Sequence, residues 1–211
     1  MKKLLNKKLF ISSFLILFLV MQFYALTEYA FAVTDNVVVT LDVDSGITIS
    51  DGAAVTMAPN ISITTDSSIG SSAWTVITNG ASGYSLAVKA SASPALVSGS
   101  NSFADYTEAV AGTPEAWSVA SGDKEFGYSA YGTDTSTAEY GAAATCGAAG
   151  VPDVGQNYEG FATSDNIIAT RATVTPVAGI ATTICFAAEQ NGVFAPVGTY
   201  TATITGTAVT L

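Results

Sequence analysis

Residues 73–88 read AWTVITNGASGYSLAV, and the fold class can be argued outward from this stretch. Apolar side chains alternate with small or polar ones on both sides of a turn-rich segment, residues 79–83; they are Trp74 and Val76 before it and Tyr84, Leu86 and Val88 after it. A period of two is that of a β-strand. With all five residues of 79–83 in the loop, Val76 lies opposite Leu86 and Trp74 opposite Val88, which predicts a hairpin with one apolar face.

The same alternation recurs along the chain, and no convincing 3.6-residue period of helix length accompanies it. Residues 37–43 alternate clearly and predict the first strand. Strands at residues 47–49 and 55–57 are expected to be joined by a loop of three or five residues around Gly52, because an even loop would put their apolar side chains on opposite faces. Further strands are expected at residues 116–120, 125–131, 166–173, 179–189 and 199–211.

Regularly spaced strands separated by Gly, Ser, Pro and Asp predict an all-β fold, a two-sheet β-sandwich of Ig-like or jelly-roll-like type. We expect one domain, residues 33–211, with long loops at about 98–115 and 132–164. Loops of that length in a compact domain are usually functional or poorly ordered.

The N-terminus has the pattern of a helical signal peptide. Four lysines lie within the first eight residues, an apolar run follows over residues 9–21, and Ala30 and Ala32 supply the small residues of a cleavage site. The sequence therefore predicts a signal peptide over residues 1–32, cleaved after Ala32. The alternative is an uncleaved membrane anchor, for which the apolar segment is short.

The charge balance is strongly acidic. The chain has 17 acidic and 7 basic residues and no histidine. Residues 1–32 hold four of the basic residues and one acidic residue, so the mature chain would keep three basic and 16 acidic ones. Such a surface repels nucleic acid, which binds through clustered Lys and Arg. The lack of histidine excludes Ser-His-Asp and Cys-His catalysis and imidazole metal ligands.

The two cysteines, Cys146 and Cys185, are predicted to form one disulfide in an exported chain. Residues 184 and 186 straddle Cys185 on the expected strand, so the bridge would attach the Gly/Ala-rich loop to the other face of that strand. A redox or metal role is the alternative reading.

Two acidic features were weighed as sites. Asp42 and Asp44 resemble the start of a calcium loop, but the twelfth position is Ala53, where a bidentate Glu is needed. Strand alternation explains both as solvent-facing residues. We therefore expect no cofactor and place no metal site, although calcium among the other carboxylates stays open. Paired carboxylates could serve a glycosidase, yet no pair stands out from surface acids, and we expect a protein that is not an enzyme.

Aromatic residues in the two long loops are candidates for stacking on sugar rings; they are Phe103, Tyr106, Tyr140 and Tyr158. Packing in the core or in a satellite cluster is the alternative for each.

The segments Trp74-Thr75-Val76 and YTATITG, residues 200–206, resemble the proximal and distal signatures of WxL-type surface domains. These are secreted, β-rich bacterial proteins that bind the cell wall non-covalently. Val76 stands where that family has leucine, and Gly206 stands where it has its distal tryptophan. The resemblance implies an exported bacterial surface protein.

These observations favour a secreted or cell-surface β-sandwich with a structural, adhesive or cell-wall-associated role. The expected partners are a cell-envelope component, a glycan or like subunits, with no nucleic acid and with membrane contact only through an uncleaved signal. Two alternatives stay open. One is a self-assembling, pilin-like fibre subunit in which residues 37–43 complete a neighbour's sheet; the other is a carbohydrate-binding module.

Overall fold

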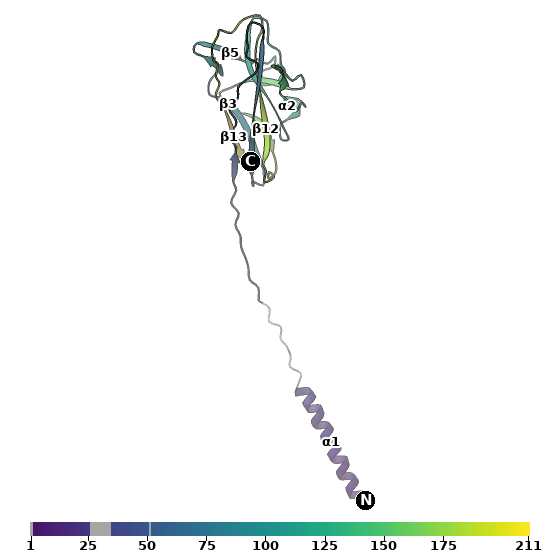
Figure 1. The fold of residues 1–211 in the computed structure, drawn as a ribbon. Helices are drawn as coiled ribbons and strands as arrows, with labels where there is room; N and C mark the ends of the chain where they lie inside the picture. Colours follow the sequence, from purple (N-terminus) through teal and green to yellow (C-terminus); the bar gives the residue numbers. More distant parts are fainter. Residues whose placement is uncertain (1, 26–34, 51) are drawn as a thin grey trace. The chain divides into compact units, whose positions relative to one another are not determined.

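The computed structural model describes residues 2–25, 35–50 and 52–211 (Figure 1). The chain divides into two units, Met1–Val43 and Asp44–Leu211. The first contains helix α1, Lys2–Ala25, and the predicted cleavage point after Ala32 lies outside the described residues. No described helix has the length and apolar character that crossing a membrane requires.

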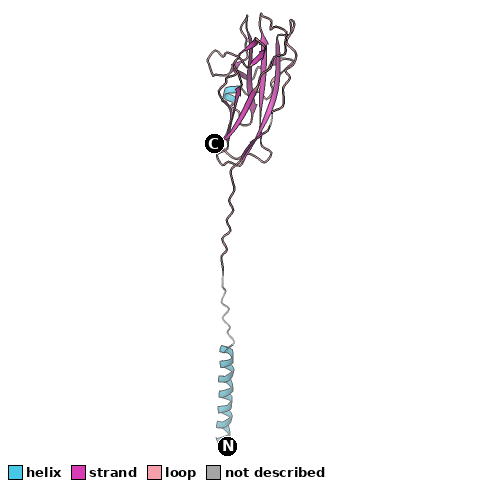
Figure 2. Ribbon diagram, turned by 90° about the vertical axis from the view of Figure 1, so that its left-hand side faces the viewer, coloured by secondary structure: helices cyan, strands magenta, loops and turns pink. Residues whose placement is uncertain are grey.

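The second unit is an all-β sandwich, as predicted (Figure 2). Its larger sheet has the order β1-β2-β12-β7-β10-β6, with neighbours antiparallel. A further strand pair extends this sheet, because β5 runs parallel to β7 and pairs with β4. The bounds are β1 Ile47–Ile49, β2 Ser67–Thr78, β4 Leu96–Ser98, β5 Asn101–Asp105, β6 Glu115–Ala116, β7 Lys124–Gly132, β10 Asn157–Gly160 and β12 Ile180–Gln190.

The smaller sheet has three antiparallel strands in the order β11-β3-β13. Their bounds are β3 Tyr84–Ala90, β11 Asn166–Arg171 and β13 Ile204–Thr210. A separate two-stranded ribbon joins β8, Gly147–Ala148, to β9, Val151–Pro152, and a short helix α2 covers Thr137–Tyr140.

The main core lies between the two sheets and follows from period-two alternation. On β12 the even positions, such as Ile184 and Phe186, enter this core, where Val76 of β2 and Leu86 of β3 are completely buried. The inward faces predicted for residues 74, 76, 84, 86 and 88 are therefore confirmed.

A second, smaller apolar cluster covers the opposite face of the larger sheet. Cys185 and Ala187 of β12 are completely buried there, beneath Tyr106 and Tyr158. A central strand is thus buried on both faces, and the segments that cover it form a third, irregular layer.

The predicted hairpin around residues 79–83 is wrong. β2 belongs to the larger sheet and β3 to the smaller one, so the loop is an arch between sheets, and the residues expected to pair face each other across the core instead. The alternation of residues 73–88 is the same in both arrangements, because both bury the same side chains.

Four other predictions need correction. The strand expected at residues 116–120 is absent beyond Ala116, where β6 ends. Residues 37–43 form no strand; Val37, Val39 and Leu41 are 83%, 86% and 84% exposed. The chain after β1 does not turn back at Gly52 but continues along β2, where Ala58 bridges Ile69. The expected loop at 98–115 contains β5 and the start of β6, and the one at 132–164 contains α2, β8, β9 and β10.

Candidate functional site

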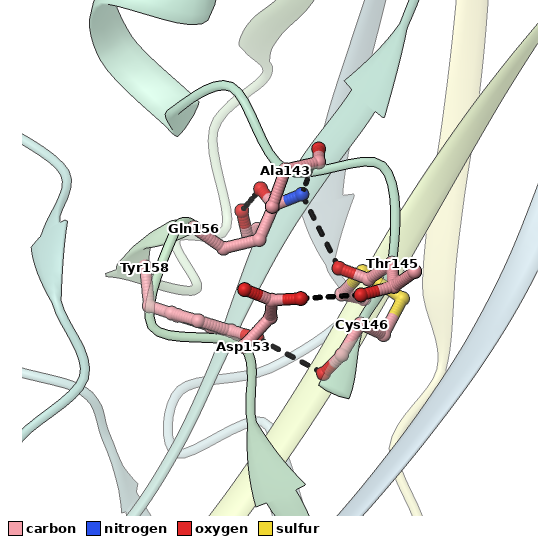
Figure 3. Close-up of a disulfide and its surroundings, with 8 residues drawn as sticks. Ala143, Thr145, Cys146, Asp153, Gln156 and Tyr158 are labelled. Atoms are coloured by element: carbon pink, nitrogen blue, oxygen red, sulfur yellow. Dashed lines mark hydrogen bonds between the residues drawn. A yellow bond between two sulfur atoms is a disulfide. The ribbon is translucent and has the colours of Figure 1, made fainter. Parts of the chain in front are cut away.

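The disulfide joins the outer layer to the middle of the larger sheet, as predicted (Figure 3). Cys146 and Cys185 are 5.2 Å apart between Cα atoms, within the usual range for a bridge. Cys185 lies on β12 between β2 and β7, and its face is opposite that of Ile184 and Phe186. The bond therefore attaches the irregular layer to the most heavily paired strand.

A buried hydrogen-bond network surrounds the bridge (Figure 3). The Gln156 side chain is completely buried; its Oε1 accepts from Ser129 Oγ at 2.7 Å and its Nε2 donates to the Ala143 carbonyl at 2.6 Å. Hydrogen bonds from Thr145 Oγ1 and the Gly155 N–H hold the pKa of Asp153 below its usual range. These contacts fold residues 143–156 into a compact cover.

The four aromatic residues singled out for sugar stacking are all in the interior. The exposed fractions are 3% for Phe103, 3% for Tyr106, 1% for Tyr140 and 0% for Tyr158. Tyr106 stacks on Trp117 with ring centroids 4.6 Å apart, and burial raises its pKa to about 12. The packing alternative thus describes these four side chains, because stacking on a sugar requires an accessible ring face.

One buried acidic residue escaped the sequence analysis. Glu159 is 5% exposed, and its Oε1 accepts hydrogen bonds from Tyr128 at 2.6 Å, from Tyr140, and from Asn166 Nδ2 at 2.6 Å. Burial raises the pKa of Glu159. Nothing in the local sequence distinguishes this glutamate from a surface acid, since its partners come from three separate elements.

No cation site emerges from the acidic residues that the structure describes, because no three Cys, Asp or Glu side chains among them converge as metal ligands would. Asp42 and Asp44 lie in or next to the extended segment that precedes β1.

The sandwich has an open apolar groove of about 1170 Å³ along one edge. One lip is residues 52–57, which follow β1, and the other is residues 199–204, which lead into β13. Trp74, Phe126 and Phe186 form part of the floor between the lips. Among the described residues that line the groove, none carries a charged side chain. We call this feature the edge groove.

The indole of Trp74 closes one end of the gap between the lips. A Cβ at Gly52 would lie 2.7 Å from Trp74 Nε1, and one at Gly206 would lie 2.9 Å from Trp74 Cε2. Glycine is therefore required on both sides of the ring. The two segments that resemble WxL signatures meet at this point, and the contact accounts for glycine at position 206.

Neither the edge groove nor its boundaries were predicted from the sequence. The only available signal was the apolar alternation of residues 199–204 and 55–57, which was read as ordinary strand pairing. Inward-facing residues on both lips are only partly buried; they are Val55, Met57, Tyr200, Ala202 and Ile204.

Comparisons of the chain with known protein families, curated proteins and solved structures found no match.

Proposed function

We propose that this chain is an exported, non-catalytic protein of the cell surface with a structural role, and that its copies associate with one another. The observation that carries the proposal is the exposed apolar segment 37–43, which precedes a well-packed sandwich. Five of its seven residues are Val or Leu with exposed fractions between 75% and 89%. Contiguous exposed apolar surface of this kind marks interaction sites.

Several further features support an extracellular location. A disulfide in the sandwich is compatible with an extracellular protein, because such bonds persist in oxidising compartments. The acidic composition keeps a secreted domain soluble. The basic and apolar pattern at the N-terminus is that of an export signal. Adhesion or wall attachment is the related role that the resemblance to WxL-type domains favours.

The proposal is tested in cells that produce the chain. We expect protease added to intact cells to cut the protein, the purified protein to begin at Val33, and the cysteines to resist alkylation until a reductant is added. Light scattering on the purified protein should give a mass above that of one chain. A monomer retained in the cytoplasm with free thiols would refute it.

A further inference from the structure

The free edge of β13 offers unpaired backbone groups beside the edge groove. Ser91 N–H donates to the Thr203 carbonyl, and Leu211 N–H donates to the Gly83 carbonyl. Thr203 and Leu211 flank β13 at its two ends, so the odd-numbered residues of this stretch bond towards β3. In an antiparallel pair the alternate residues point their N–H and C=O groups the other way. The backbone groups of the even positions 202, 204 and 206 therefore point away from β3. In the described part of the chain β13 pairs with β3, and Thr201, another odd position, pairs with Val97.

The segment 37–43 has the length and pattern of the missing strand. Seven residues in extended form span about 23 Å, and the six-residue lip 199–204 spans about 20 Å, so the segment can cover the whole lip. Val37, Val39, Leu41 and Val43 share one face of an extended chain, and the edge groove presents an apolar floor that alternate side chains of an added strand would contact. Strand addition of this kind combines backbone pairing with pockets for every second side chain.

Charge also matches the segment to the groove. Residues 36–41 carry no charged side chain, and neither do the described residues that line the groove, although the chain has 17 acidic residues. Insertion would therefore bury no charge, while Asp35 and Asp42 would stay at the ends or on the outer face of the added strand.

The chain leading into β1 is held in a way that opposes folding back into its own groove. Asn79 Nδ2 donates to the Asp44 carbonyl at 2.8 Å, Asn79 Oδ1 accepts from Gly46 N–H at 2.7 Å, and Thr78 Oγ1 donates to the Gly46 carbonyl at 2.8 Å. These bonds hold residues 44–46 as a continuation of β1, whereas the groove begins beyond the other end of β1, at Gly52. A return to that groove would require a reversal at 44–46 and the loss of these bonds.

We propose that residues 37–43 of one copy insert as a strand into the edge groove of a second copy, against the free edge of β13. This inference rests on the proposed self-association and names the surfaces that carry it. Because donor and acceptor are different surfaces, each copy can give a segment and receive one. The contact is heterologous and generates an open chain of subunits or a closed ring.

The test uses the full-length chain and four variants. Leu41→Asp places a charge on the inward face of the donor, and Thr40→Asp places the same charge on its outward face as a matched control. Ala202→Trp fills the groove, and Val177→Trp adds the same bulk at a position that is 95% exposed and does not line the groove. Thermal unfolding followed by circular dichroism establishes that each variant is folded.

Association is measured by analytical ultracentrifugation. We expect Leu41→Asp and Ala202→Trp each to weaken self-association by about 100-fold or more. The first removes a leucine that insertion would bury, and the second fills the groove that receives the strand. The controls should stay within about threefold of the wild type. An equimolar mixture of Leu41→Asp and Ala202→Trp should form dimers and nothing larger, because only one donor and one acceptor remain intact.

The outcomes separate the two proposals. Oligomers that persist unchanged in Leu41→Asp and Ala202→Trp would overturn the groove while leaving self-association in place. A monomeric wild-type chain would overturn self-association itself. A monomer in which residues 37–43 are protected from hydrogen exchange would show that the segment fills its own groove, which also overturns the exchange between copies.

Discussion

The disulfide makes a quantitative prediction about stability. Cys146 and Cys185 are 39 positions apart, and a cross-link over that separation lowers the entropy of the unfolded chain enough to stabilise the fold by about 4 kcal/mol. We expect the double variant Cys146→Ala/Cys185→Ala to lose about that free energy of unfolding. For a domain of this size the corresponding fall in Tm is about 8–16 °C.

The assay is equilibrium unfolding in urea, followed by circular dichroism, with the wild type in oxidised and in fully reduced form as companions. Reduction breaks the cross-link but keeps both sulfurs, so the difference between reduced wild type and the double variant isolates the packing of the completely buried Cys185 side chain. A loss below about 1 kcal/mol in both samples would refute the reasoning. It would mean that Gln156 and Tyr158 hold the outer layer without the bond.

Three other predictions concern the buried groups. Because burial raises the pKa of Glu159, its contribution to stability is present below its unfolded-state pKa of about 4.3 and is lost as pH rises through the higher folded-state pKa. The free energy of unfolding of the wild type should therefore fall as pH rises through this range, and Glu159→Gln should make that fall smaller. The same pH dependence in both proteins, measured by urea unfolding, would contradict this. Gln156→Ala leaves Ser129 and the Ala143 carbonyl without their partner and should lower the free energy of unfolding by about 2–4 kcal/mol. Asn157→Ala removes a more exposed hydrogen bond and should lower it by about 1 kcal/mol. Equal losses would show that burial of the Gln156 hydrogen bonds does not matter. Leu86 is 0% exposed, so Leu86→Ala should lower the free energy of unfolding by about 2–5 kcal/mol, measured by thermal unfolding. Val177 is 95% exposed, so Val177→Ala should change it by no more than about 0.5 kcal/mol. A small loss in Leu86→Ala would show that the core can collapse around the missing side chain.

Local alternation predicted which side chains face inward, and little about which strands are neighbours. Trp74, Val76, Leu86 and Val88 enter the core as expected, yet β2 and β3 belong to different sheets. A period of two states that a strand has a buried face, and it is the same for a hairpin and for an arch. The strands at β7, β11 and β12 were predicted to within a few residues for the same reason.

The features that were missed depend on several distant segments at once. Glu159 is buried by groups from β7, α2 and β11, and its own neighbours in sequence give no sign of this. Of the four aromatic residues in the expected loops, Tyr106 and Tyr158 are buried on the outer face of the larger sheet, whereas Phe103 and Tyr140 belong to the main core. The edge groove is bounded by residues 52–57 and 199–204, which come from opposite ends of the sandwich sequence, so neither segment alone indicates it.

The pairing of β2 with β12 has a consequence for the order of events during folding. Residues 67–76 pair with residues 180–189, and β3 pairs with β13 across a similar separation, so both sheets join the two ends of the domain. A high contact order of this kind makes folding slow. The larger sheet cannot be completed before β12 has been synthesised, nor the smaller sheet before β13, so under the export proposed above the chain would still be unfolded over most of its length when it reached a translocation channel.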